Sequence, residues 1–432
     1  MTNIAHSAMI SLYEGYWKNS GLKNERIKFN LKGEIILKNV VVVGGVRTPF
    51  GKMGGALRQF HMADLTGMAI RGLVDKYGLD PEVIDAVTVG CALHDARTHN
   101  IARYATLYAG LPQKTSSVFV EMQCGSAIAA INYAAYRIMA GEADVMIAGG
   151  GESYSQRFAK FSMSVEPYKM IAPAAVPSQL SPNKEECISM LDISDRMAKR
   201  WGITREECDE FALRSQLLTK EAQDTNFFEG HVIPVTIPAT KKTPEQFITV
   251  DEQPRPDTTM EGLSKLKSVL EGGVTTAGNS SGRNDGAAAV LVMTEEKARE
   301  LGLTPIMRWV GGTDVGVDPC YMGIGPAFSN LKILKNKGLK LSDIDVWECN
   351  EAFAAQNLSV IREMENQTGE KIDMAKWNPH GGAIAMGHPN GASGARIAMY
   401  AMRHLERNDA RYAMISSCCG GGLGVSTLFE KM

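Results

Sequence analysis

Two segments far apart in this chain repeat the same succession of turn, acidic residues and apolar strand. Residues 78–90 read GLDPEVIDAVTVG, and residues 338–350 read GLKLSDIDVWECN. A second pair supports the first, because the Ala-rich stretch at 125–140 and the strand VMIAGGG have counterparts in ASGARIAMYAMRHL and YAMISSCCGGG. Strand and helix patterns alternate around both pairs, so we expect two related α/β halves.

The two halves enclose a stretch of different composition. We expect the first half at residues 39–153, opening with the apolar strand NVVVVGGVRTPFG, and its completion at about 282–304. The second half is expected at 305–432. Residues 154–281 are rich in Pro and Lys around one amphipathic helix at 205–224, which predicts an inserted loop domain.

Charge and hydropathy exclude several classes of function. The 432 residues hold 46 Lys and Arg against 48 Asp and Glu, and the net charge of −2 supplies no long-range field for nucleic acid or an anionic membrane. No apolar run approaches the ~18 residues of a membrane span, and no secretion signal opens the chain. Residues 1–38 contain acidic residues, unlike a transit peptide, and form an extension of unassigned role.

The eight cysteines suit a reducing compartment. They form no CxxC pair, and no His is spaced beside a Cys pair as a zinc site requires. We therefore expect a cytoplasmic protein with no metal site and with neither nucleic acid nor membrane as a partner.

Cys124 stands directly before an apolar run, in EMQCGSAIAAINYAAYRIMAG. Apolar residues surround this predicted helix, so its N-terminus should lie at an interior surface, where the helix dipole favours a thiolate. The alternative is that Cys124 is one more small buried hydrophobic residue.

Two further chemistry-bearing residues lie in glycine-rich turns. His388 is in NPHGGAIAMGHPNGASGAR, where glycines let a ligand approach the backbone, although a histidine there could also simply bond a loop carbonyl. Cys418 opens CCGGGLG after the strand YAMISS, and the following glycine N–H groups could hold an oxyanion. Cys419 should point to the opposite side of that strand.

Polar turns mark two more candidate positions. Asn350 opens NEAFAAQ after the strand IDVWEC, where it could cap the next helix or position a water molecule. The stretch GGVTTAGNSSGRNDGAAAV at 272–290 could donate hydrogen bonds to a bound polar chain or be an ordinary tight turn.

Five stretches in chain order together resemble the thiolase family of acyl-CoA acyltransferases: the segment around Cys124, TAGNSSGRNDGAAA, NEAFA, GGAIAMGHPNGASGAR and CCGGGLG. VRTPFGKMGGAL and GGGESYS extend the likeness over nearly all of residues 39–432. The resemblance implies an α/β fold of two βαβαβαββ halves in a five-layered αβαβα arrangement, with the insertion as a lid over coenzyme A. It also implies a homodimer or homotetramer.

The same resemblance implies a set of roles. Cys124 would be the acylated nucleophile, His388 the base that activates it, and Cys418 the second acid/base. Asn350 would hold an oxyanion-hole water, and the backbone N–H groups of Cys124 and Gly420 would form the other oxyanion hole. The residues that resemble the family's coenzyme A and substrate contacts are Ser281, Arg255 and Met190.

Two departures from the family pattern concern the acyl pocket. Ser189 stands where many relatives have a His, whereas the neighbouring Met190 is retained. Residues 156–187 also match poorly. The resemblance therefore leaves the acyl-chain preference open.

The chemistry agrees with these roles. Joining two thioesters through a carbon–carbon bond requires one acyl group held on a good nucleophile and one α-carbon deprotonated. Two thiols and an imidazole can do both, so we expect no metal or redox cofactor. The leading hypothesis is an acetyl-CoA acetyltransferase that interconverts two acetyl-CoA with acetoacetyl-CoA and CoA.

Three alternatives remain at this point. A 3-ketoacyl-CoA thiolase of fatty-acid breakdown would use the same residues with a roomier pocket. A decarboxylating condensing enzyme would need a Cys-His-His site instead of a Cys418 base. A non-catalytic subunit that only binds acyl-CoA would have no need to retain Cys124, His388 and Cys418 together.

Overall fold

The structure, a computed structural model, describes residues 28–29, 35–94, 97–162, 168–169, 172–176 and 178–432. Most of the N-terminal extension expected at 1–38 lies outside the described residues, as does part of the divergent stretch at 156–187. Within the described ranges, no helix is both long enough and apolar enough to cross a bilayer.

The first half alternates strands and helices in the order βαβαβαββ. Its elements are β3 (Val40–Arg47), α2 (Met62–Lys76), β5 (Ala86–Gly90), α3 (Ile101–Tyr108), β6 (Ser116–Val120), α4 (Ser126–Met139), β7 (Val145–Ser153) and β10 (Asn284–Thr294). The strands lie side by side as β3-β10-β7-β5-β6. β5 pairs in parallel with β6 and β7, whereas β10 runs antiparallel to β3 and β7.

The second half repeats this order. Its elements are β11 (Met307–Gly316), α9 (Gly325–Lys337), β12 (Val346–Cys349), α10 (Ala354–Thr368), α12 (Asn390–Arg407), β13 (Tyr412–Cys419) and β14 (Leu423–Lys431). The strand order β11-β14-β13-β12 matches that of the first half, and the place of β6 is taken by a single bridge between Trp347 and Trp377. The echoed segments end in β5 and β12, so the two related halves predicted from the repeat are confirmed.

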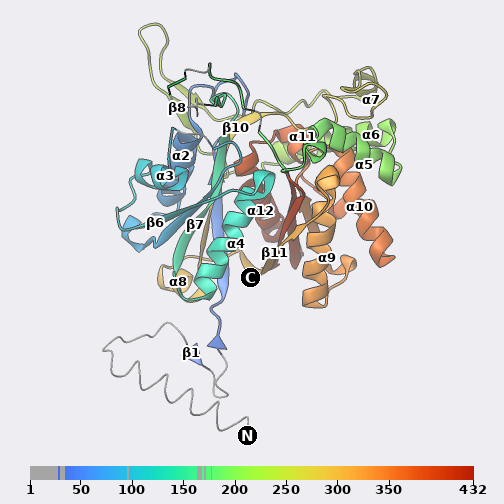
Figure 1. Cartoon of the computed structure of the whole chain (residues 1–432). Coiled ribbons are helices and arrows are strands. Elements are labelled where there is room, and N and C mark those ends of the chain that lie inside the picture. Colours follow the sequence, from blue (N-terminus) through green and yellow to red (C-terminus); the bar gives the residue numbers. More distant parts are fainter. Residues whose placement is uncertain (1–27, 30–34, 95–96, 163–167, 170–171, 177) are drawn as a thin grey trace.

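The layers are clear in Figure 1, where α2 and α3 cover the outer face of the first sheet, α9 and α10 that of the second, and α4 and α12 lie between the sheets. Two residue pairs of β11 with β3, Met307 with Val42 and Arg308 with Val41, join the sheets along one edge. The five-layered arrangement expected from the sequence is therefore confirmed.

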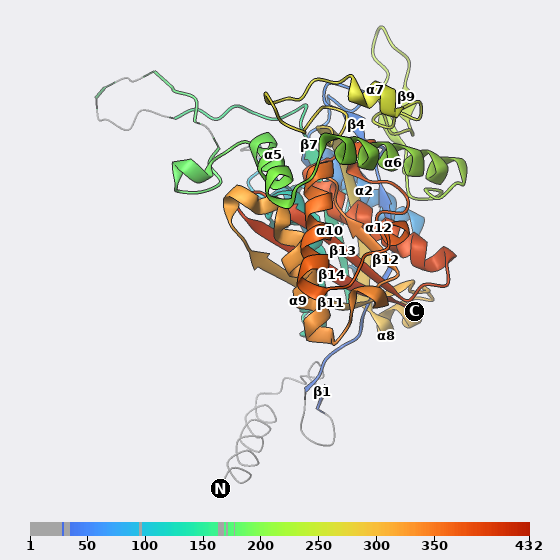
Figure 2. The same cartoon turned by 90° about the vertical axis from the view of Figure 1, so that its right-hand side faces the viewer.

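The inserted residues form α5 (Met190–Trp201), α6 (Arg205–Asp224), β8 (Val235–Ile237), β9 (Gln246–Ile248) and α7 (Met260–Ser264). α6 has the bounds predicted for the amphipathic helix, and Thr204 and Glu207 form a capping box at its start. Figure 1 and Figure 2 show α5 and α6 at one end of the molecule, where they pack against α10 and α11 (Ala383–Met386) of the second half. The guanidinium of Arg47, at the end of β3, bonds both oxygens of Asp251 at 2.6 and 2.7 Å, which ties the insertion to the first sheet.

Shorter elements complete the chain. They are β1 (Lys28–Phe29), β2 (Ile35–Ile36), β4 (Gly51–Lys52), α8 (Glu295–Glu300) and α11 (Ala383–Met386).

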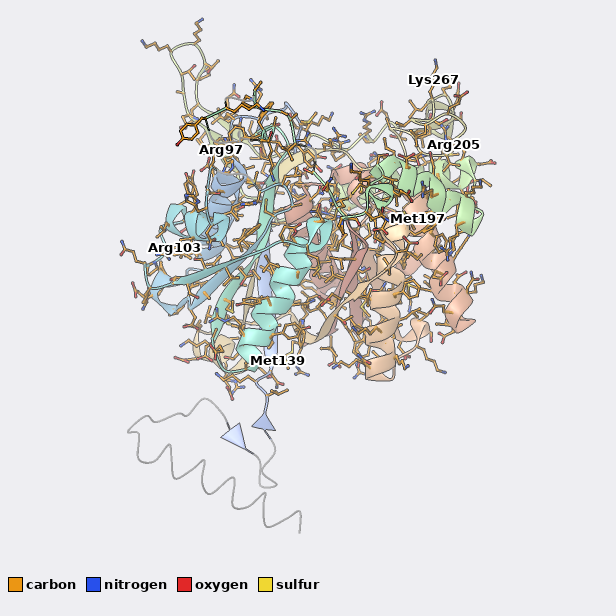
Figure 3. The ribbon with its side chains drawn as sticks, in the orientation of Figure 1. Arg97, Arg103, Met139, Met197, Arg205 and Lys267 are labelled. Carbon is orange, nitrogen blue, oxygen red and sulfur yellow. The ribbon has the colours of Figure 1, made fainter. Side chains whose placement is uncertain are left out.

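The central helices α4 and α12 approach each other more closely than ordinary side chains would allow. A Cβ placed on Gly394 of α12 would lie 2.6 Å from the backbone nitrogen of Ile128 in α4, well inside van der Waals contact. Figure 3 places Met139, the last residue of α4, at the end of the molecule opposite Arg205 and Lys267 of the insertion. The N-terminus of α4, and with it Cys124, therefore faces the inserted segment.

Gly394→Ala tests this contact. Alanine is the better helix former, but its Cβ would push α12 away from Ile128, and overpacking of this kind costs about 1–3 kcal/mol. We expect a lower Tm in thermal unfolding. The matched control is Gly316→Ala at the end of β11, where no atom of the described residues, other than Gly316 and its chain neighbours, lies within 4 Å of the added Cβ. An equal Tm in the two variants would contradict the close packing.

Candidate active site

Cys124 lies in a single 3-10 turn, Gln123–Gly125, that leads directly into α4. The hydroxyl of Ser126 accepts the N–H of Met122 at 2.9 Å and donates to the carbonyl of Gln123 at 2.6 Å, which closes the turn. Burial, and then the negative charge of Glu152, raises the pKa of Cys124 to about 12. At neutral pH the nucleophile candidate is therefore a thiol that must lose its proton in order to react.

Two polar side chains hold His388 in the loop between α11 and α12. The backbone N–H of His388 donates to Oδ1 of Asn284 at 3.0 Å, and the ring Nδ1 lies 2.6 Å from Oγ of Ser393. The Ser393 hydroxyl also donates to the carbonyl of Pro389 at 3.1 Å, so it is left to accept a proton from Nδ1. This assignment, made from the bonding partners, leaves Nε2 of His388 as the basic nitrogen.

Burial, and to a lesser extent the positive charge of Arg396, lowers the pKa of His388 to about 3. The imidazole is therefore neutral at neutral pH. A neutral imidazole near a neutral thiol can act as a general base only when it takes the thiol proton during the reaction.

Asn350 follows β12 and points its side chain at His388. Nδ2 of Asn350 lies 3.4 Å from Nε2 of His388, and Oδ1 is buried without a hydrogen-bond partner among the described residues. α10 begins only at Ala354, with Phe353 as its N-cap, so the helix-capping interpretation of Asn350 is wrong. The free Oδ1 can accept a hydrogen bond from a water molecule or a ligand.

Cys418 and Cys419 face opposite sides of β13, as strand alternation predicts. Cys418 packs with Met414 and Leu428, whereas Cys419 packs with Ile415 and its sulfur lies against Gly125. Burial raises the pKa of Cys418 well above its usual value, and the next largest cause is the negative charge that Cys124 carries as a thiolate.

Gly420 lies beside the turn of Cys124, and Ser281 lies beside the loop that follows Asn350. A Cβ on Gly420 would lie 3.3 Å from Cγ of Gln123, so the turn after β13 touches the turn that carries Cys124. The N–H of Ser281 donates to the carbonyl of Ala352 at 3.0 Å, which attaches its turn to the loop after Asn350.

Arg255 and Met190 lie in the insertion. Arg255 lines a cavity of about 250 Å³ together with Gln216, Thr259, Gly278 and Ile384. Met190 is the half-buried first residue of α5, and Ser189 caps that helix by accepting the N–H of Asp192 at 3.1 Å. Ser189, which stands where many relatives have a His, therefore serves as the N-cap of α5.

Sequence reasoning missed Glu152, a buried carboxylate at the centre of the site. It accepts N–H groups from Ala92 at 3.0 Å, Leu93 at 3.2 Å and Gly391 at 3.2 Å, so it joins the end of β5 to the first turn of α12. Burial nevertheless raises its pKa to about 7. A lone Glu at the end of a glycine-rich strand carries no sequence signal of this role.

Nearly all of the chain from residue 40 onward is similar to known proteins of one family. Residues 40–296 match the family model described as the thiolase N-terminal domain, and residues 303–431 match the thiolase C-terminal domain. The chain is 40% identical over 406 residues to the 3-oxoadipyl-CoA/3-oxo-5,6-dehydrosuberyl-CoA thiolase of Escherichia coli, which covers 92% of this chain and 100% of that protein.

Two solved structures are similar over almost their whole lengths. The acetyl-CoA acetyltransferase of Bacillus anthracis is 36% identical with a TM-score of 0.85, covering 92% of this chain and 99% of that one. Human mitochondrial 3-ketoacyl-CoA thiolase in complex with CoA is 35% identical with a TM-score of 0.82, covering 91% of this chain and 98% of that one.

Ser393→Ala should release the fixed tautomer of His388. Without the hydroxyl, the Nδ1 proton loses its acceptor, which costs about 1 kcal/mol, or about a fivefold change in the ratio of the two tautomers. ¹⁵N NMR of histidine-labelled protein reads the ratio, with the His388 signal assigned by its loss in His388→Asn. Ser393→Thr keeps a hydroxyl and should keep the wild-type ratio; an unchanged spectrum in Ser393→Ala would contradict the assignment.

Proposed function

The chain belongs to the thiolase family, and from that premise we propose that it moves acyl groups between coenzyme A thioesters through an acyl-Cys124 intermediate. The observation that carries this proposal is the meeting of two helix starts. Cys124 precedes α4, His388 precedes α12, and Asn390 in the first turn of α12 contacts the Cys124 sulfur at 3.3 Å.

In the first half-reaction His388 acts as a general base. Nε2 takes the proton from Sγ of Cys124 while the sulfur attacks the thioester carbonyl. The carbon–sulfur bond to coenzyme A breaks, and the imidazolium returns the proton to the departing thiolate. The backbone N–H groups of Cys124 and Gly420 are the proposed donors to the oxyanion of the tetrahedral intermediate.

In the second half-reaction Cys418 handles the α-proton. Before Cys124 is acylated, Cys418 gives its thiol proton to the Cys124 sulfur, which the preceding turnover left as a thiolate. The Cys418 thiolate then removes a proton from the α-carbon of a second acyl-CoA, and the carbanion attacks the acyl group on Cys124, whose sulfur leaves. A water molecule held by Asn350, together with His388, is proposed to stabilise the enolate oxygen. Thiolysis is the same sequence in reverse, in which Cys418 returns its proton to the α-carbon.

Coenzyme A is the proposed common ligand, as in the human structure solved with CoA. Ser281, Arg255 and Met190 are the proposed contacts along its length. The two thiols and the imidazole complete the chemistry, so we propose that no metal or redox cofactor takes part. A cytoplasmic location and a homodimeric or homotetrameric assembly belong to the same proposal.

The proposed substrate is the shortest one, with acetyl-CoA as donor and acetoacetyl-CoA as the condensation product. One observation favours a second candidate, a 3-ketoacyl-CoA whose chain ends in a carboxylate. A cavity of about 410 Å³ is lined by the basic side chains of His94, Arg157 and Lys160 and by Leu93, whose N–H binds Glu152. The E. coli relative is named for such a substrate.

More positive charge stands beside this cavity. The guanidinium of Arg97, labelled in Figure 3, lies 4.1 Å from the centre of the Phe158 ring, and Phe158 also lines the cavity. Cationic side chains near an acyl pocket favour a terminal carboxylate over a methyl group.

Cysteine variants separate the two half-reactions. Cys124→Ser should abolish both the exchange of labelled CoA into acetyl-CoA and the condensation. Cys418→Ala should keep the exchange but lose about 10²–10⁴-fold in condensation, because only the carbon–carbon step needs the second acid/base. Cys419→Ala, on the opposite face of β13, is the matched control and should keep both reactions. Retained exchange in Cys124→Ser would refute the proposed nucleophile.

Substrate preference is tested with three 3-ketoacyl-CoAs in thiolysis. Acetoacetyl-CoA should give the highest kcat/KM if the acetyl proposal holds. If the second candidate holds, 3-oxoadipyl-CoA should exceed 3-oxohexanoyl-CoA, which has the same chain length without the carboxylate, by about tenfold or more. Replacing Arg157 and Lys160 by Gln should then remove that preference. A kcat/KM that is highest with 3-oxohexanoyl-CoA would contradict both.

A further inference from the structure

The sulfur of Cys124 is contacted by an amide that the roles above leave unused. Asn390, the first residue of α12, donates a hydrogen bond from Nδ2 to Sγ of Cys124 at 3.3 Å. Oδ1 of the same amide accepts a hydrogen bond from the hydroxyl of Tyr154 at 3.0 Å. Asn390 is only 9% exposed and Tyr154 is half-buried, so little water competes for these bonds.

The hydroxyl of Tyr154 bonds the end of the amide that faces away from the sulfur. The oxygen and nitrogen of an amide are assigned from their partners. A phenol hydroxyl that donates to Oδ1 leaves the Nδ2 protons directed at the sulfur. The reversed amide would turn its oxygen toward Cys124 and repel a thiolate, so only the observed orientation suits a negatively charged sulfur.

We propose that Asn390 is a catalytic residue that stabilises the thiolate of Cys124, and that Tyr154 is the positioning residue that holds the Asn390 amide. The inference rests on the proposed acyl-Cys124 chemistry. When His388 takes the proton from Sγ, negative charge develops on a sulfur that is mostly enclosed by protein. An N–H donor already in place offsets part of that cost, because hydrogen bonds to charged acceptors are the strong ones.

The donor acts in both directions of the reaction. In acylation it stabilises the sulfur as Nε2 of His388 takes the proton and the new carbon–sulfur bond forms. In the condensation step the bond between Cys124 and the acyl carbon breaks, and its electron pair returns to the sulfur beside the same N–H. The positive end of α4, which follows Cys124 directly, also stabilises the thiolate.

Asn390 lies in a short segment at the start of α12 that also contacts the other groups of the site. His388 lies two residues before it, and the N–H of Gly391, the next residue, binds the Glu152 carboxylate at 3.2 Å. Burial, and then the charge of that carboxylate, raises the pKa of Cys124 to about 12, so formation of the thiolate is unfavourable. Residues 388–391 therefore carry His388, the Asn390 amide that binds the sulfur, and the Gly391 N–H that binds Glu152.

Alkylation of Cys124 by iodoacetamide tests the donor without any substrate. The alkylation rate at pH 8 is proportional to the fraction of thiolate. Peptide mass spectrometry measures this rate at Cys124, and the half-buried free Cys320 serves as internal reference. We expect Asn390→Leu to slow the alkylation of Cys124 about 10- to 100-fold and Tyr154→Phe about three- to tenfold, while Cys320 reacts as before.

Tyr136→Phe is the matched control. It removes a hydroxyl that donates to the carbonyl of Gly312 at 2.9 Å further along α4, and it should leave the Cys124 rate unchanged. Equal rates in wild type, Asn390→Leu and Tyr154→Phe would overturn the proposal. A change in Asn390→Leu alone would overturn the role assigned to Tyr154.

Turnover distinguishes this inference from the proposed function. In the exchange of labelled CoA into acetyl-CoA, both variants should lower kcat by the factors seen in alkylation while KM stays within about threefold, because the lost interaction belongs to the reacting sulfur. A wild-type protein without exchange or thiolysis would refute the proposed function, and the alkylation rates would still decide whether Asn390 stabilises the thiolate.

Discussion

The contact between the backbones of α4 and α12 is the constraint on which the site depends. Because Gly394 carries no Cβ, the two helices meet at van der Waals distance at Ile128, and their N-termini end at the same place. The residues before those N-termini carry Cys124 and His388. Each of the two related halves places one helix between the sheets. The proposed nucleophile and the proposed base therefore come from opposite halves of the chain.

The place where α4 and α12 meet is buried, and burial shifts the pKa values of the ionisable groups there. It raises the pKa of Cys124 to about 12, lowers that of His388 to about 3 and raises that of Glu152 to about 7. Before the reaction, the Cys124 thiol and the His388 imidazole are both uncharged, so neither needs water to solvate a charge. Charge appears only during reaction, which is the condition under which fixed N–H donors and helix dipoles contribute most.

The repeat at 78–90 and 338–350 was sufficient to predict the paired halves, because strand and helix periodicity is a local property of sequence. The motifs likewise led to Cys124, His388 and Cys418 as candidates. The partners Asn390, Ser393 and Glu152 were not predicted, since their roles arise only where α12 crosses β5 and α4. The sequence left Asn350 with two interpretations, and the structure excludes helix capping because Phe353 is the N-cap of α10. The water-holding role of Asn350 stays a prediction.

The most direct test of this account is to locate the acyl group during turnover. Wild-type protein mixed with acetoacetyl-CoA and CoA is quenched in acid within the steady state, digested, and mapped by tandem mass spectrometry. The account predicts an acetyl group on the sulfur of Cys124 and on no other of the eight cysteines. An acetyl group on Cys418 or Cys419 in its place would contradict the account.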